Sequence, residues 1–132
     1  MVSAIVNDPG NGMAEPMVRA AAEALARNAS APAVATLMRK LSASRDAPDS
    51  EALATLISGI SNPAAQATLI YSARGNKDSP NPASRVVAIR ALGNYPTLES
   101  LQAMRQLHRD ADPAVQAASR EVAQRIESII GR

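Results

Sequence analysis

The side chains best suited to catalysis or metal binding are nearly absent from this sequence. His108 is the only histidine and there is no cysteine, so several histidine or cysteine ligands cannot be gathered around a metal ion. A Ser-His-Asp arrangement would need His108 as its base, but Arg109 and Asp110 beside it fall at a predicted helix end and no nucleophile elbow is present. A single histidine there more commonly interacts with the helix dipole. The sequence therefore predicts no catalytic, cofactor-binding or metal-binding residue and a protein that is not an enzyme.

Basic residues and one tyrosine are the remaining candidates for a site, and they suit partner binding. Tyrosine is favoured at interfaces because it buries a large area and keeps a polar tip. Of the two tyrosines, Tyr95 precedes Pro96 in a predicted turn, where we expect it to pack over that turn; Tyr71 suits the core and a groove equally well. The partner-binding candidates are Arg39, Lys40, Tyr71, Arg74, Arg105 and Arg109.

The composition indicates that helices must position these residues. Hydrophobic residues make up 46% of 132 residues, with no Phe or Trp, and alanine and leucine are strong helix formers. A β-sandwich would be richer in aromatic and β-branched residues. The length suits a single domain. The fold class predicted is all-α.

Prolines mark where the helices begin. Proline is tolerated at the first helical position, and the potential capping residues Asn62, Asn81 and Asp112 each precede one. Between prolines, apolar residues recur at helical spacing, as in Val34 to Leu41. These signals predict seven helices, near residues 15–28, 32–43, 48–60, 63–74, 82–93, 96–109 and 113–130.

Every second helix starts a new copy of a repeat. Leu37, Leu69 and Leu101 recur every 32 residues, and alternate prolines are 31 to 34 residues apart. Such a period is typical of stacked helical hairpins. A basic residue followed by aspartate also recurs at 45/46, 77/78 and 109/110. We interpret these pairs as structural joints, in which the aspartate braces the following hairpin and the basic residue meets the last carbonyls of its helix.

The pattern Arg85-x-x-Ala88-x-x-Ala91-Leu92-Gly93, followed by a turn, a leucine-containing helix and Asp110-Ala-Asp112-Pro113, resembles HEAT-like repeats. Among HEAT-like repeats, the pattern most resembles the phycobilisome-lyase type, which is common in bacteria. The similarity is best over residues 80–126 and poorest over 47–78. It implies a short α-α superhelix, or solenoid, over residues 13–132, whose second helices (32–43, 63–74 and 96–109) line a concave face that holds a protein partner.

The functional expectation is thus a non-catalytic scaffold for protein–protein interaction. Its mildly basic groove could hold an acidic peptide or phosphates, so nucleic-acid backbone binding is the alternative, although no interleaved aromatics support base stacking. The resemblance also allows an accessory subunit of a lyase-type enzyme. Residues 1–12 are expected to be a flexible leader or an N-terminal cap. No signal peptide or membrane span is visible, which slightly favours a cytoplasmic location.

Overall fold

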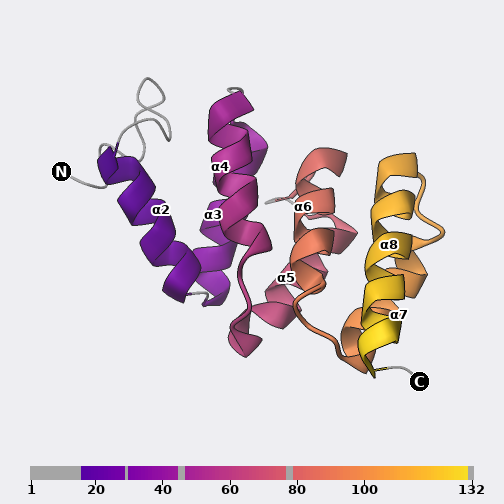
Figure 1. Ribbon diagram of the computed structural model, residues 1–132. Coiled ribbons are helices and arrows are strands. Elements are labelled where there is room, and N and C mark those ends of the chain that lie inside the picture. The colour runs from indigo at the N-terminus through magenta and orange to yellow at the C-terminus, as the bar shows by residue number, and fades with distance from the viewer. Residues whose placement is uncertain (1–15, 29, 45–46, 77–78, 131–132) are drawn as a thin grey trace.

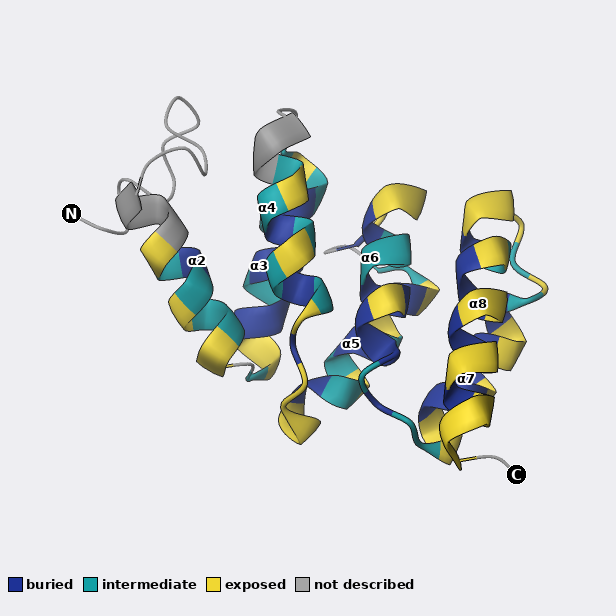
Figure 2. Cartoon of the chain, in the orientation of Figure 1, coloured by how far each residue is buried: buried dark blue, intermediate teal, exposed yellow. Residues whose placement is uncertain are grey.

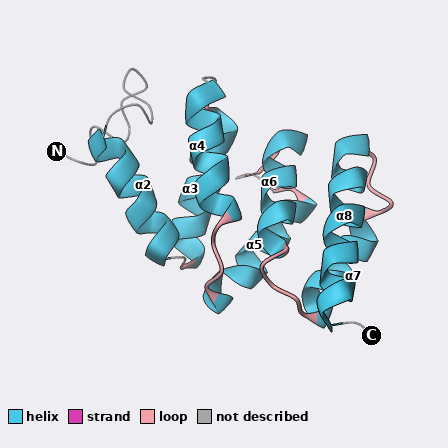
Figure 3. Cartoon of the chain, viewed as in Figure 1, coloured by secondary structure: helices cyan, strands magenta, loops and turns pink. Residues whose placement is uncertain are grey.

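The computed structural model describes residues 16–28, 30–44, 47–76 and 79–130. Within them the chain is all-helical and forms seven α-helices, as expected (Figures 1 and 3). The expected leader, residues 1–12, lies outside the described part. The helices are α2 (Pro16–Asn28), α3 (Ala31–Ala43), α4 (Ala47–Ser58), α5 (Gln66–Arg74, preceded by a 3₁₀ turn at Pro63–Ala65), α6 (Pro82–Leu92), α7 (Leu98–Leu107) and α8 (Pro113–Ile130).

Side-chain caps fix several of the helix starts. The Asp112 carboxylate accepts hydrogen bonds from the backbone N–H groups of Ala114 (2.8 Å) and Val115 (3.3 Å), and Asn62 accepts one from Ala64 (2.9 Å). Asn81, the third expected cap, makes no capping bond and instead donates to the Ser42 carbonyl. At the start of α7, Thr97 is the cap, so the helix begins two residues later than Pro96 predicts.

The helices form two layers, visible one behind the other in Figure 1. Helices α2, α4, α6 and α8 pack against one another in chain order, and α3, α5 and α7 do the same in the second layer. The two layers bury a continuous core between them (Figure 2). The three leucines of the 32-residue period, Leu37, Leu69 and Leu101, all lie in this core.

The closest pairs of helices are not those expected from the turns. Helix α6 makes its most extensive contacts with α5 and α8, whereas its expected hairpin partner α7 packs mainly against α8. The turn at 93–97 carries the chain away from α6, because its side chains bond to the turn that follows α4, at residues 58–62. Asn94 donates to the carbonyls of Ser58 (2.7 Å) and Ile60 (3.1 Å). The Tyr95 hydroxyl donates to the Asn62 carbonyl (2.7 Å). Tyr95 is buried over this turn, as predicted.

The Arg85 side chain links α6 to the end of α5 and to the loop before α8. The Arg85 guanidinium donates to the Ala73 carbonyl (3.0 Å) at the end of α5 and pairs with the Asp110 carboxylate (2.5 Å). The second Asp110 oxygen accepts the backbone N–H of Asp112 (2.9 Å). The Arg85 bond and that backbone bond lower the pKa of Asp110, although desolvation opposes them.

Asp110 therefore braces a joint, as expected, but its cationic partner is Arg85 and not the adjacent Arg109. Arg109 was expected to bind the last carbonyls of α7, and it does so through its backbone N–H, which bonds the Gln106 carbonyl (3.3 Å). The backbone N–H groups of His108, Arg109 and Asp110 already bond those carbonyls. The other two basic–aspartate pairs, at 45/46 and 77/78, lie outside the described residues.

Candidate functional site

Of the six expected partner-binding residues, Tyr71 and Arg74 line one groove together. Arg39 is exposed on α3 and donates to the Thr36 hydroxyl (3.1 Å). Lys40, the next residue, is half-buried, and desolvation, followed by repulsion from Arg39, lowers its pKa. Arg105 forms an ion pair with Glu127 of α8 (2.9 Å), and Arg109 is exposed in the loop after α7. Among the residues that line that groove, Arg74 is the one basic candidate.

The groove that holds Tyr71 and Arg74 runs between α5 and α7, in the layer of the second helices. Its volume is about 490 Å³. We call it the α5–α7 groove, and its lining residues are Pro63, Ala64, Gln66, Ala67, Ile70, Tyr71, Arg74, Glu99, Gln102, Ala103 and Gln106.

Both walls follow from helical periodicity. Residues at i, i+3, i+4 and i+7 share one helix face, and Glu99, Gln102, Ala103 and Gln106 have this spacing on α7. Residues 67, 70, 71 and 74 have the same spacing on α5. The α7 wall was not predicted, because glutamine carries neither the charge nor the aromatic ring by which candidates were chosen. The helical spacing of the polar residues Glu99, Gln102 and Gln106 was the feature of the sequence that could have indicated this wall.

Two polar contacts hold the walls together and show that α5 and α7 run parallel. Near their N-termini, the Gln66 side chain donates to the hydroxyls of Thr97 (2.6 Å) and Ser100 (3.0 Å). Near their C-termini, Arg74 donates to the Gln106 side-chain oxygen (3.0 Å). Hydrogen bonds between equivalent ends therefore join the two helices at both ends of the groove.

The middle of the groove is apolar with one aromatic side chain in the open. Ile70 is half-buried and Ala103 is buried, whereas the Tyr71 side chain is 62% exposed. Tyr71 therefore belongs to the groove and not to the core. An exposed aromatic ring beside an apolar floor offers area that a ligand can cover.

The groove carries one charge of each sign. Glu99 lies in the first turn of α7 and Arg74 in the last turn of α5, and each favours the dipole of its own helix. Arg74 bonds only the neutral Gln106, and within the described part of the chain Glu99 has no ion-pair partner. The α5–α7 groove is thus dipolar, with an acidic residue and a basic residue among those that line it.

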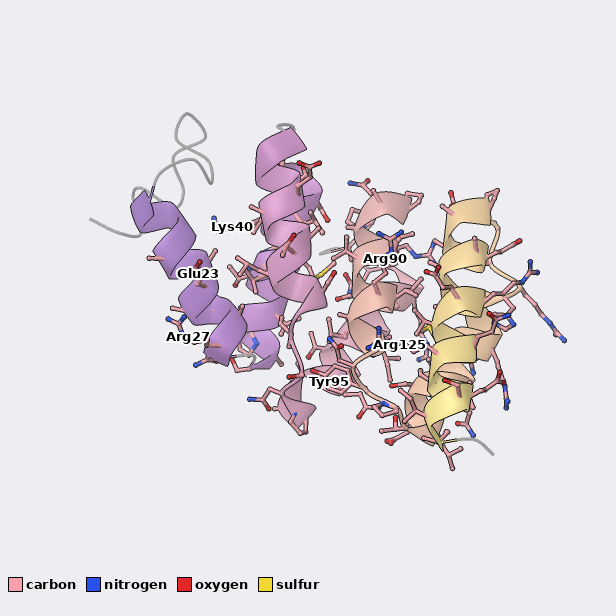
Figure 4. The ribbon with its side chains drawn as sticks, viewed as in Figure 1. Glu23, Arg27, Lys40, Arg90, Tyr95 and Arg125 are labelled. Carbon is pink, nitrogen blue, oxygen red and sulfur yellow. The ribbon has the colours of Figure 1, made fainter. Side chains whose placement is uncertain are left out.

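Two other hollows lie in the opposite layer. One, of about 840 Å³, is open between α2 and α4, and Glu23 and Arg27 are on its wall. The other, of about 340 Å³, lies between α6 and α8, where Arg90 and Arg125 line it beside Gly93. Figure 4 labels these four side chains. No expected partner-binding residue lines either hollow.

His108 caps the C-terminus of α7 through its backbone, and its buried Nε2 atom has no hydrogen-bond partner among the described residues. Among the residues that the structure describes, no three His, Cys, Asp or Glu side chains gather as a metal site would require. None of the described helices has both the length and the apolar character needed to cross a bilayer.

Comparisons of the chain with protein-family models, curated proteins and solved structures find no match. The chain is therefore defined by its own features, an all-helical two-layer fold with a dipolar groove between two parallel helices.

Proposed function

We propose that this protein is a non-catalytic scaffold, a short HEAT-like solenoid that binds a segment of a partner protein in the α5–α7 groove. The observation that carries the proposal is the Tyr71 ring, 62% exposed beside Ile70 in a groove that also contains Arg74. Tyrosine and arginine are the residue types most enriched among those that dominate binding energy at protein interfaces.

The repeat character of the fold supports the solenoid part of this proposal. Side-chain bonds link residues 31 to 36 positions apart, which matches the sequence period. Stacked repeats that contact only their neighbours build extended surfaces suited to holding a partner.

The charge distribution favours a protein segment over a nucleic-acid backbone. Phosphate binding needs several cations on one surface, but Glu127 neutralises Arg105 and Glu99 stands in the groove itself. A role beside a lyase-type enzyme would rest on the family resemblance alone.

Selection from a random peptide library on the immobilised chain tests the proposal. Peptides that are enriched should bind the Tyr71→Ser variant about tenfold or more weakly, since aromatic anchors commonly contribute that much. Arg74→Gln should also weaken binding, and affinities would be measured by titration calorimetry.

Matched changes elsewhere provide the controls. Ile129→Ser and Arg120→Gln alter equally exposed residues on α8 and should leave the affinity unchanged. The proposal fails if no peptide is enriched, or if enriched peptides bind Tyr71→Ser as tightly as the wild type.

A further inference from the structure

We infer that the α5–α7 groove selects its ligand by the arrangement of charges along it. The ligand is an extended protein segment with a basic side chain at one end, a carboxylate at the other and an apolar residue between them. The inference rests on the proposed function and specifies the chemistry of the partner. It follows from three zones of the groove, taken in order along its length.

The two charges lie at opposite ends of the groove. Glu99 is seven residues before Gln106 on α7, which at 1.5 Å per residue places them about 10 Å apart along the helix. Arg74 is level with Gln106, because it donates a hydrogen bond to that side chain. A ligand cation is therefore favoured near Glu99 and a ligand anion near Arg74.

The stretch between the charges suits an apolar side chain flanked by peptide groups. Ile70, Tyr71 and Ala103 line it, together with Gln102, which has no hydrogen-bond partner in the described part of the chain. The Gln102 amide has both donors and an acceptor available for a ligand backbone.

An extended segment matches this length. Residues i, i+2 and i+4 share one face of a strand and span about 13 Å, so lysine, leucine and glutamate at those positions would reach Glu99, Ile70 and Arg74. The flexible lysine and glutamate side chains can take up the difference from 10 Å.

A ligand that carries both signs also explains why the groove has both charges with no counter-ion for either in the described part of the chain. Each charge has a second role toward its own helix dipole. If the two charges served the helix dipoles alone, the groove would show no preference for ligands of a particular charge. A measured preference therefore distinguishes ligand binding from the dipole role.

The test uses four capped peptides of one length: Lys-Ser-Leu-Ser-Glu, Lys-Ser-Leu-Ser-Lys, Glu-Ser-Leu-Ser-Glu and Gln-Ser-Leu-Ser-Gln. Each is titrated into the full chain, labelled with ¹⁵N, and dissociation constants are taken from amide shifts. Acetylated and amidated ends remove the terminal charges. Because an exposed ion pair contributes modestly, the mixed peptide should bind about two- to fivefold tighter than either like-charged peptide.

Charge reversal in the groove should change the preference. Arg74→Glu should favour the doubly basic peptide and Glu99→Lys the doubly acidic one, each by about two- to fivefold. Glu99→Gln and Arg74→Gln are milder variants, should either reversal unfold the chain. Glu99→Gln should abolish the preference of the groove for the mixed peptide over the doubly acidic one, and Arg74→Gln should abolish its preference over the doubly basic one.

The outcomes separate the two proposals. Equal binding of all four peptides, with loss of all binding in Tyr71→Ser, would overturn selection by charge and leave the peptide groove standing. A preference for the mixed peptide that persists in every charge variant would also overturn it. Failure of every peptide, both here and in the library selection, would overturn both proposals.

Discussion

Gly75 shows how a single residue ends a helix. It follows α5 with a φ of 94°, in the region that side chains rarely adopt. An added Cβ would also lie 3.3 Å from the Nε of Arg85, the side chain that binds the end of α5. The sequence allowed the prediction that Gly75 ends this helix, but it did not indicate that Gly75 lies close to Arg85.

Gly75→Ala should therefore lower the free energy of unfolding by about 1–3 kcal/mol, because a non-glycine residue would be strained there. Gly59→Ala is the matched control, since its Cβ would meet only ordinary contacts and its φ is not positive. Urea denaturation measures both. Equal effects of the two changes would contradict this account.

The position of a charged residue within the repeat decides where its side chain lies. Adding the 32-residue period to Arg74 gives Gln106, so Arg105 is one residue out of register, about 100° around the helix. That rotation takes Arg105 out of the α5–α7 groove and brings it to Glu127. The sequence predicted which residue types would form the candidate site. Which of them lie together depends on their angular positions around each helix, and these were not predicted.

At the scale of elements, prolines predicted the helices well and the caps less so. Every described helix begins within three residues of its predicted start. Asn81 and Asp112 precede prolines in the same way, yet only Asp112 bonds the first turn of its helix. A capping residue type allows this bond, but the local backbone decides whether it forms.

Asp112→Ala should cost about 1 kcal/mol of stability, the usual value for a lost N-cap. Asn81→Ala should cost less, because it removes only a 3.4 Å bond to the Ser42 carbonyl. Thermal unfolding followed by circular dichroism would compare the two variants. A larger loss from Asn81→Ala would show that the capping assignment is wrong.

Across the whole molecule, the Arg85–Asp110 pair connects three elements, α5, α6 and the loop between α7 and α8. Long-range contacts of this kind could not be predicted, because the sequence shows Asp110 beside Arg109 and not beside Arg85. Both side chains are mostly buried, so the pair is screened less than a surface ion pair.

The pair makes stability depend on pH. Because folding lowers the pKa of Asp110 below its usual 3.8, its contribution is complete above the unfolded-state pKa and is lost as pH falls through the folded-state pKa. Urea titrations at pH 7, 5, 4 and 3 should show this loss below about pH 5. Asp110→Asn should be less stable at pH 7 and should flatten this part of the profile, since the amide keeps an acceptor for Asp112 but not the charge. An unchanged profile would contradict this role.

The bonds from the turn at 93–97 to the turn before it also bear on how such a chain can change in length. Asn94 and Tyr95 satisfy carbonyls that belong to the preceding repeat. A duplication or deletion of one whole period would leave each turn beside an equivalent turn, with its donors and acceptors matched. An insertion or deletion of any other length would separate the two turns and leave their polar groups without hydrogen-bond partners. We therefore expect viable length variants of this chain to differ by whole units of about 32 residues.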